Sequence, residues 1–282
     1  MVDGLAHSFS ALEALSSYHL YREEEYPMVS LIVVTWNSGH AMAITIKNLL
    51  QQSYPHYELI IIDASSSDRT LEWLEELRNE RLRMVTFSDF RRYEMMNEGI
   101  AQAKGEYVQF LFPGDTFISR DSLKIMMSHA LDAGKPHLLY CGSLLHHGRS
   151  DAETLLRPFT RSELEKGRQP TSLQSSWWRK SLFETLAPFD TSYAMRAGFE
   201  LMCRFINRKE LSSLEVERVL IDCNVQSITR KMILSHFWET GRAVRLHFGF
   251  IYYLRWLCVQ KDLGRLYRSW MRSFKIAFLG RN

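Results

Sequence analysis

Short apolar runs, in which hydrophobic residues do not alternate with polar ones, recur through the first part of the chain. The first run is MVSLIVVTWN, and similar runs follow in YELIIID, LRMVTF and EYVQFLF. An apolar run of strand length with β-branched residues predicts a strand that is buried on both faces of a parallel sheet. The four runs therefore predict four strands of one sheet.

Helical segments separate these strands. The helix after the first strand has four apolar residues available for its buried face, which are Ile44, Ile46, Leu49 and Leu50. Asp68 can cap the next helix, in RTLEWLEELRN, and Gly105 closes the third, in RYEMMNEGIAQAKG. Strands and helices that alternate through short connections predict an α/β fold, with an open and mostly parallel sheet covered by helices on both faces.

The pattern loosens after about residue 121. It still predicts a helix in DSLKIMMSHALDAG, a strand in HLLYCGSLL and a helix in RAGFELMCRFINRK. Before the first strand, Phe9 to Tyr21 is predicted to form a short amphipathic helix.

The last forty residues follow a helical pattern with two faces. The apolar face holds Leu263, Leu266, Tyr267, Trp270, Met271, Phe274 and Phe278, and the basic face holds Arg265, Arg268, Arg272 and Lys275. A basic helix with Trp and Phe on its apolar side can lie in a membrane interface. It can equally pack its apolar face on the domain and leave its basic face in solvent, so the pattern leaves both interpretations open.

Basic residues are concentrated in this tail. Of 35 basic and 32 acidic residues, nine basic and one acidic lie between Arg242 and Arg281, which leaves 26 and 31 for the rest. A basic tail on an acidic body is typical of a protein that meets an anionic surface. Because the body is acidic and no RNA or DNA motif is present, we predict membrane contact through 242–281 and no nucleic-acid partner.

Composition excludes several other classes of protein. With 282 residues, 46% of them hydrophobic, the chain can bury a large core. The four cysteines form no C-x-x-C pair, which argues against a zinc site or a disulfide framework and favours a reducing compartment. The N-terminus does not follow the pattern of a secretory signal, and the most apolar stretch, LHFGFIYYLRWLC, is too short and too charged to span a bilayer. We therefore predict a cytoplasmic protein that associates with the inner face of the plasma membrane.

Three polar clusters follow predicted strands: TWN at 35–37, DASSSD at 63–68 and PGD at 113–115. Because the C-terminal ends of parallel strands share one edge, the clusters should converge on one crevice. There Asp63 can accept hydrogen bonds from a base or a ribose, and Asp115 can bind a divalent cation. Each signal is weak alone, since an Asp after a strand is usually a turn former.

Four segments in order, VSLIVVTWN, QQSYPHYELIIIDASSSDRT, MMNEGIAQAKGEYVQFLFPGD and WWRKSLFETLAPFDTSYAMRAGFELMCRF, resemble the inverting family 2 glycosyltransferases of GT-A fold. The resemblance covers about two thirds of the chain and is greatest to bacterial enzymes that build surface polysaccharide. It implies a Rossmann-like nucleotide-diphospho-sugar transferase fold, and a sugar donor bound across the strand ends.

The resemblance also assigns roles to single residues. It places Thr35 and Asn37 beside the nucleotide and Asp63 at its base or ribose. Glu94 and Asn97 match the polar pair of the helix before the metal motif, and both are predicted to bind nucleotide. Asp115 matches the last Asp of that motif, which is expected to coordinate Mg²⁺ or Mn²⁺ bridging the two phosphates.

Several positions depart from the family pattern. Ala64 stands where a second Asp is common, and Phe112 stands where Asp or Asn is common. Gly198 occupies the position of the general base that inverting transfer needs. Glu200 is the candidate substitute, although two residues on a helix correspond to about 200° of rotation.

These observations predict three parts and one activity. The parts are an N-terminal helical extension over 1–27, a GT-A glycosyltransferase domain over 28–232 and a basic amphipathic helical tail over 233–282. The activity is metal-assisted, inverting transfer of a sugar from a nucleotide-diphosphate donor to a lipid-linked or polysaccharide acceptor. The alternative, based on Ala64 and Gly198, is a catalytically degenerate protein that binds nucleotide or a partner transferase.

Overall fold

The computed structural model describes residues 25–68, 70–146, 152–225 and 229–258. The predicted helix over Phe9 to Tyr21 and the two tail faces after Leu263 lie outside these residues, so they stay predictions. The three-part division of the chain also stays a prediction.

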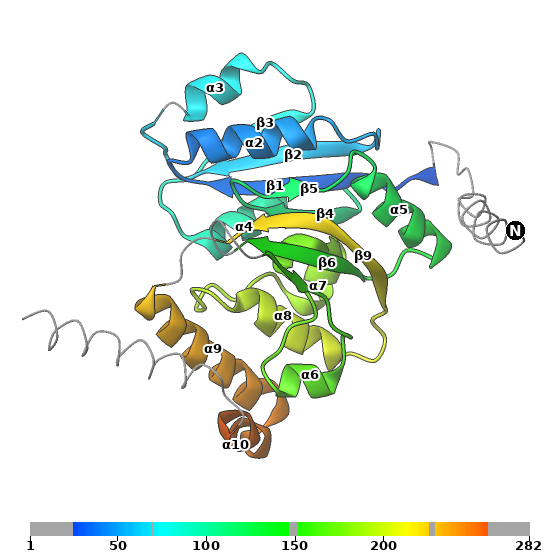
Figure 1. The fold of residues 1–282 in the computed structure, drawn as a ribbon, viewed down its shortest axis with the longest axis vertical. Coiled ribbons are helices and arrows are strands. Elements are labelled where there is room, and N and C mark those ends of the chain that lie inside the picture. Colours follow the sequence, from blue (N-terminus) through cyan, green and yellow to red (C-terminus); the bar gives the residue numbers. More distant parts are fainter. Residues whose placement is uncertain (1–24, 69, 147–151, 226–228, 259–282) are drawn as a thin grey trace, which may run out of the picture.

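A nine-stranded sheet forms the centre of the protein, in the order β3-β2-β1-β4-β8-β6-β9-β5, with β7 paired to β6 (Figure 1). Its parallel half consists of β1 (Val29–Thr35), β2 (Tyr57–Asp63), β3 (Leu82–Thr86) and β4 (Tyr107–Leu111). These are the four strands that the apolar runs predict. The α/β fold class is confirmed.

The other half of the sheet mixes strand directions. It consists of β5 (Thr116–Phe117), β6 (Leu138–His146), β7 (Ala152–Leu155), β8 (Ser176–Arg179) and β9 (Ser213–Asn224). Since β8 is antiparallel to both β4 and β6, β6 runs in the direction of β4, and β9 is parallel to β6. Strands β1, β2, β4, β6 and β9 therefore end along one side of the sheet. We call this side the strand-end edge; it follows Thr35, Asp63, Leu111, His146 and Asn224.

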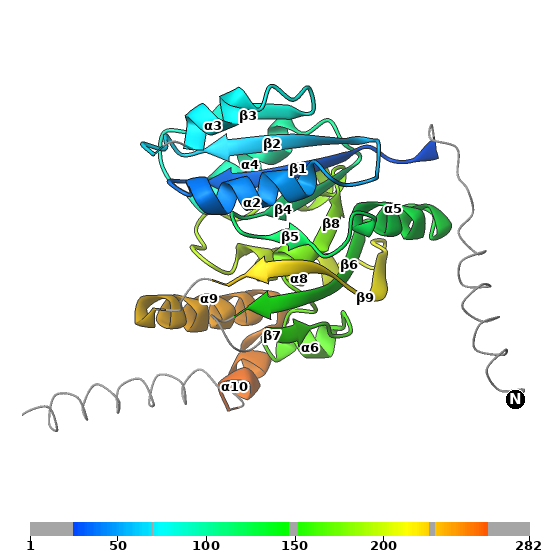
Figure 2. The same cartoon turned by 45° about the horizontal axis from the view of Figure 1, so that its top comes forward.

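Helices cover both faces of the sheet because the strands bury alternate residues on opposite sides. On β1, Leu31 and Val33 pack with α2 (Gly39–Leu49) and α5 (Ser122–Asp132). Ile32 and Val34 pack into a second core with α4, α8 and α9, which span Arg92–Gln102, Ala197–Ile206 and Arg230–Phe248. Figure 2 shows α2 in front of the sheet and α4 behind it.

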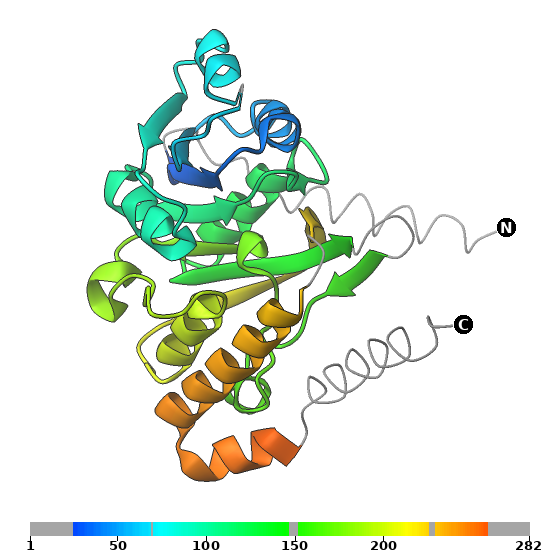
Figure 3. The same cartoon turned by 90° about the vertical axis from the view of Figure 1, so that its left-hand side faces the viewer.

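Shorter helices complete the described chain. They are α3 (Thr70–Glu76), α6 (Arg161–Glu165), the 3-10 helix η2 (Leu173–Ser175), α7 (Leu182–Leu186) and α10 (Phe250–Cys258). The helices α9 and α10 lie at the end of the molecule opposite α3 (Figures 1 and 3). Trp256 of α10 and Phe237 of α9 are buried in the second core, so this part of the predicted tail packs on the domain.

Two local predictions need correction. The buried face of α2 is formed by Met42, Thr45, Ile46 and Leu49, whereas Ile44 is 45% exposed. Met42 and Ile46 lie about one turn apart, and Ile44, two residues from each, points to the other side. The residue Leu50 follows the helix and is half-buried.

Gly105 does not close α4. The helix ends at Gln102, and a Cβ at Gly105 would lie 2.5 Å from the backbone nitrogen of Ser30. Glycine is needed here because two backbones approach closely. Asp68 does cap α3, as predicted: its Oδ1 accepts from the Thr70 amide at 3.1 Å, and its Oδ2 accepts from the Gly39 amide, also at 3.1 Å.

Candidate active site

The polar clusters after β1 and β2 are joined at the strand-end edge. The backbone amide of Asn37 donates to Ser66 Oγ at 2.8 Å, and the side-chain oxygen Asn37 Oδ1 accepts from the backbone amide of Ser67 at 2.8 Å. Thr35 Oγ1 is buried and has no hydrogen-bond partner among the described residues. A buried hydroxyl without a partner is costly unless a ligand or water satisfies it.

Asp63 is buried at the end of β2 and holds its own turn. Its Oδ2 accepts from the Ser66 amide at 2.7 Å, and its Oδ1 accepts from Ser66 Oγ at 2.5 Å. The carboxylate thereby fixes the segment that joins Asn37. Its predicted contact with a base or ribose stays a prediction.

Two exposed aromatic rings stand beside these clusters. Trp36, between Thr35 and Asn37, is 52% exposed, and Phe90, after β3, is 42% exposed. Their ring centroids lie 6.0 Å apart and their planes are inclined by 32°. Sequence reasoning missed this pair because Phe90 belongs to no motif, although the Trp within TWN was a signal.

Asp115, like Asp63, is a carboxylate of the edge with no exposed surface. Its Oδ2 accepts from the Phe112 amide at 2.8 Å, and its Oδ1 accepts from the Asn224 amide at 2.9 Å. Burial raises the pKa of Asp115 to about 7, although these two amides and the Gln174 side chain lower it; the negative charge of Asp222 raises it further.

The backbone around Asp115 is built to hold it in this position. Gly114 has a φ of 96°, and a Cβ there would lie 2.3 Å from Asn224 Nδ2, so only glycine fits. Thr45 of α2 donates its hydroxyl to the Asp115 carbonyl at 2.9 Å. The PGD sequence therefore positions Asp115 between α2 and the end of β9.

The environment of Asp115 fits a divalent cation. Among the described residues no cationic side chain forms an ion pair with Asp115, and the hydrogen bonds from two backbone amides and from Gln174 offset only part of the cost of burying its charge. The described residues also contain no cluster of three His, Cys, Asp or Glu side chains. Mg²⁺ is commonly held by one or two carboxylates together with substrate phosphates, so one buried carboxylate is a sufficient protein contribution.

Glu94 and Asn97 lie on α4 but make different contacts. Glu94 Oε1 accepts from Arg91 Nη1 at 2.9 Å. Asn97 clamps the backbone of Phe189: its Nδ2 donates to the carbonyl at 2.9 Å, and its Oδ1 accepts from the amide at 3.0 Å. The structure thus uses Asn97 to hold the loop before α8, and the nucleotide-binding role of both residues stays a prediction.

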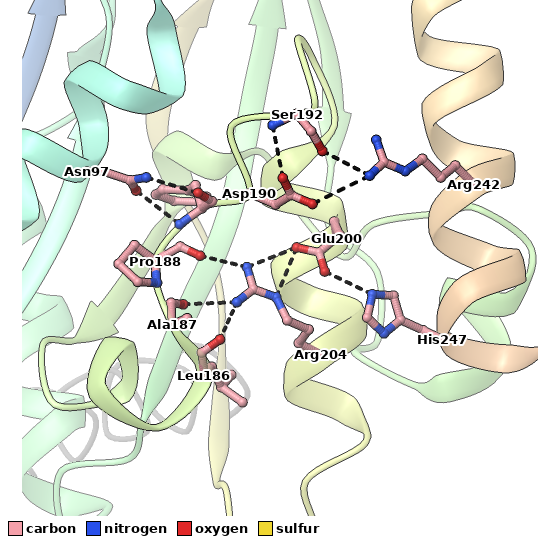
Figure 4. A network of polar contacts seen from close by, with 11 residues as sticks. Asn97, Leu186, Ala187, Pro188, Asp190, Ser192, Glu200, Arg204, Arg242 and His247 are labelled. Carbon is pink, nitrogen blue, oxygen red and sulfur yellow. Dashed lines mark hydrogen bonds and ion pairs between the residues drawn. The ribbon is translucent and has the colours of Figure 1, made fainter.

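Glu200 lies in the interface between α8 and α9. It is 3% exposed; its Oε2 lies 2.9 Å from Arg204 Nη2, and its Oε1 lies 2.9 Å from His247 Nε2 (Figure 4). Arg204 also donates to the carbonyls of Ala187 and Pro188. Both oxygens of Glu200 are therefore engaged, which is the placement of a residue that fixes helices rather than one that meets an acceptor.

Gly198, at the position expected for the base, needs no special backbone conformation. A Cβ there would lie 3.4 Å from Leu173 Cδ1, an ordinary contact. Leu173 of η2 occupies the neighbouring space.

The mixed sheet, with these polar groups and a buried carboxylate at one edge, has the arrangement of a GT-A fold. The chain belongs to Glycosyl transferase family 2, whose model matches residues 30–189. The resemblance seen in the sequence is thereby confirmed.

Curated relatives are similar to this chain over part of its length. The "PGL/p-HBAD biosynthesis glycosyltransferase" of Mycobacterium bovis is 24% identical over 207 residues, which are 70% of this chain and 77% of the relative. The "Putative teichuronic acid biosynthesis glycosyltransferase TuaG" of Bacillus subtilis is 29% identical over 109 residues, which are 38% of this chain and 43% of TuaG.

Solved structures share the fold at low identity. S. aureus TarS 1-349 in complex with UDP-GlcNAc has a TM-score of 0.63 at 17% identity, covering 78% of this chain and 66% of TarS 1-349. The chain thus spans slightly less than two thirds of that protein. The mannosyltransferase PcManGT from Pyrobaculum calidifontis, in complex with GDP-Man and Mn2+, has a TM-score of 0.56 at 18% identity, covering 90% of this chain and 81% of PcManGT.

Proposed function

We propose that this glycosyltransferase transfers a sugar with inversion, from a nucleoside diphosphate donor, to a lipid-linked or polysaccharide acceptor. The observation that carries the proposal is Asp115, a buried carboxylate without an ion-pair partner among the described residues, at the edge where β1, β2 and β4 end. The names of the relatives, which refer to PGL/p-HBAD and teichuronic acid biosynthesis, support an acceptor of the cell envelope.

In the proposed mechanism the residues of the edge bind and orient the donor. Trp36 and Phe90 offer an apolar surface on which a base can stack, and Thr35 Oγ1 has hydrogen-bonding capacity to spare. Asp115 would hold Mg²⁺ or Mn²⁺, which when bound supplies positive charge for the departing diphosphate. Burial of Asp115 strengthens its interaction with a cation.

We also propose that α9 and α10 contact the membrane at its cytoplasmic face. Their exposed apolar residues are Leu234, Trp238, Leu246, Phe250, Ile251 and Leu254, and we call these six residues the α9–α10 patch. Arg242, Arg245 and Trp238 line a hollow of about 540 Å³ between the two helices. Apolar side chains beside arginines suit an anionic lipid surface. No helix among the described residues is long and apolar enough to cross a bilayer.

Isothermal titration with UDP and GDP, each with and without Mn²⁺, tests the donor site. We expect one nucleotide to bind, and its affinity to depend on Mn²⁺ in the unaltered chain but not in Asp115→Asn. Equal affinity with and without Mn²⁺ in the unaltered chain would contradict the role of Asp115.

A second function, nucleotide binding without transfer, is favoured by Gly198 and by the engaged carboxylate of Glu200. Sugar release from the bound donor separates the two functions. Multiple turnover would exclude the non-catalytic function, whereas Mn²⁺-dependent binding without turnover would support it.

A further inference from the structure

A histidine and an aspartate meet at the strand-end edge, outside the residues assigned so far. His146 Nε2, at the end of β6, lies 3.0 Å from Asp222 Oδ1 on β9. The side chains are 42% and 35% exposed, so an acceptor can reach them. His146 Nδ1 has no hydrogen-bond partner among the residues that the structure describes.

Strand pairing places this His146–Asp222 pair close to the candidate metal site. Asp222 is the partner of Thr116 in the antiparallel pairing of β5 with β9, and Thr116 follows Asp115 directly. Paired residues in antiparallel strands have Cα atoms about 4.5 to 5.5 Å apart. Asn224, two residues after Asp222, donates its amide to Asp115 Oδ1 at 2.9 Å. Asp222 of the pair therefore lies on the strand next to the segment that carries Asp115, the carboxylate that would hold the metal.

Three carboxylates near the N-terminus of α8 are engaged elsewhere. Glu200 is bonded to Arg204 and His247. Glu239 of α9 accepts from three backbone amides, those of Ala194, Met195 and Arg196. Asp190 accepts from the Ser192 amide at 2.9 Å and lies 3.8 Å from Arg242. With glycine at 198, none of these groups offers a free base.

We propose that His146 is the general base of the transfer and that Asp222 is its positioning residue; the inference rests on the proposed function. Asp222 accepts from Nε2–H, which leaves the lone pair of Nδ1 to take the proton. The acceptor hydroxyl loses this proton to Nδ1 while its oxygen forms the bond to the anomeric carbon. The bond from that carbon to the diphosphate oxygen breaks, and the diphosphate leaves with the electron pair. Asp222 stabilises the imidazolium that forms.

A purely structural role for the pair predicts a different outcome. An exposed contact of this kind between neighbouring strands contributes little to stability and nothing to turnover. Chemical rescue separates the roles, because only a lost base is replaced by imidazole from solution.

The experiment measures UDP release from UDP-GlcNAc and GDP release from GDP-Man, with Mn²⁺ and with water as the acceptor. We expect His146→Ala to lower kcat about 100-fold to 10,000-fold, the range of general-base catalysis, with unchanged nucleotide affinity. Added imidazole should restore part of the rate. Asp222→Asn should lower kcat about 10-fold or more, again with unchanged nucleotide affinity. His137→Ala is the matched control, since His137 directly precedes β6, at the end opposite His146, and hydrogen-bonds Ser212.

The failures are distinguishable. Full turnover by His146→Ala, or a loss that imidazole does not restore, would overturn the base assignment and leave the proposed function intact. Nucleotide binding by the unaltered chain without release of UDP or GDP, with bacterial membranes added as a source of acceptor as well as with water alone, would overturn both and support the non-catalytic function.

Discussion

At the scale of single residues, the candidate site depends on groups whose positions have an energetic cost. Burial makes the charged form of Asp115 energetically costly, and the buried hydroxyl of Thr35 has no hydrogen-bond partner among the described residues. Such costs are common where a protein is preorganised for a ligand. They make the ligand-free protein sensitive to pH at this site.

The first prediction concerns the pH dependence of stability. Because the pKa of Asp115 rises from 3.8 to about 7 on folding, the folded chain holds more protons than the unfolded chain between these values. Stability contributed by this group is therefore lost as pH rises from about 4 to 7. The unaltered chain should therefore lose roughly 2 kcal/mol of its free energy of unfolding between pH 5 and pH 8 through this group. The Asp115→Asn variant has no group to titrate there and should not show this loss. Urea unfolding in EDTA measures it; identical pH profiles would contradict the inference.

A second prediction concerns Trp36. If a base stacks on the exposed ring, Trp36→Ala should weaken UDP or GDP binding by about 5-fold to 100-fold, since stacking contributes about 1 to 3 kcal/mol per base. Trp238→Ala, which removes an exposed tryptophan from α9, should leave nucleotide binding unchanged. Titration calorimetry on both variants measures the nucleotide affinity. An affinity of Trp36→Ala equal to that of the unaltered chain would exclude stacking on Trp36.

At the scale of elements, α8 and α9 are joined by charged contacts as well as by their apolar faces. Glu200 of α8 bonds His247 of α9, and Glu239 of α9 accepts from the amides at the start of α8. Anionic groups at a helix N-terminus are stabilising. The two helices therefore fix each other, and with them the loop that Arg204 and Asn97 hold.

The third prediction separates a structural from a catalytic role for Glu200. Glu200→Gln should lower the free energy of unfolding by about 3 kcal/mol, because Arg204 is left without its buried partner. Turnover per folded molecule should remain. Glu165→Gln, which breaks the more exposed pair with Arg161, should cost less than about 0.5 kcal/mol. Unchanged stability with lost turnover would instead support Glu200 as the base.

Sequence patterns predicted the elements better than their contacts. The buried strands follow from apolar runs, and Asp115 follows from the rule that parallel strands end at one edge. The burial of Glu200 was not predictable, since it depends on His247, 47 residues away. The approach of Gly105 to Ser30 and the meeting of His146 with Asp222 likewise join distant parts of the chain. Local periodicity carries no information on such pairs.

At the scale of the whole molecule, the strand-end edge and the α9–α10 patch are joined by one helix. Arg230, the first residue of α9, is six residues from Asn224, the last of β9, and the helix then runs to α10. The six exposed apolar residues lie on two helices that pack against each other, and a contiguous apolar surface is typical of an interaction site.

The fourth prediction concerns this patch. The full chain should bind vesicles that contain phosphatidylglycerol and bind phosphatidylcholine vesicles weakly. Trp238→Ala combined with Ile251→Ser should reduce binding about 10-fold or more, because apolar area enters the interface. Trp36→Ala is the matched control, and co-sedimentation measures all three proteins. Unchanged binding by the double variant would exclude a contribution of the patch to membrane binding.

The length of α9 has a consequence for the choice of acceptor. Nineteen residues of helix extend about 28 Å, and α9 is braced along α8 by Glu200 and Glu239. The α9–α10 patch has members near both ends of α9, Leu234 and Trp238 near its start and Leu246 near its end, so in the proposed membrane contact the helix would lie along the bilayer surface. The strand-end edge, six residues from the start of α9, would then stay close to the lipid, and this would favour acceptors whose hydroxyl lies near the membrane surface.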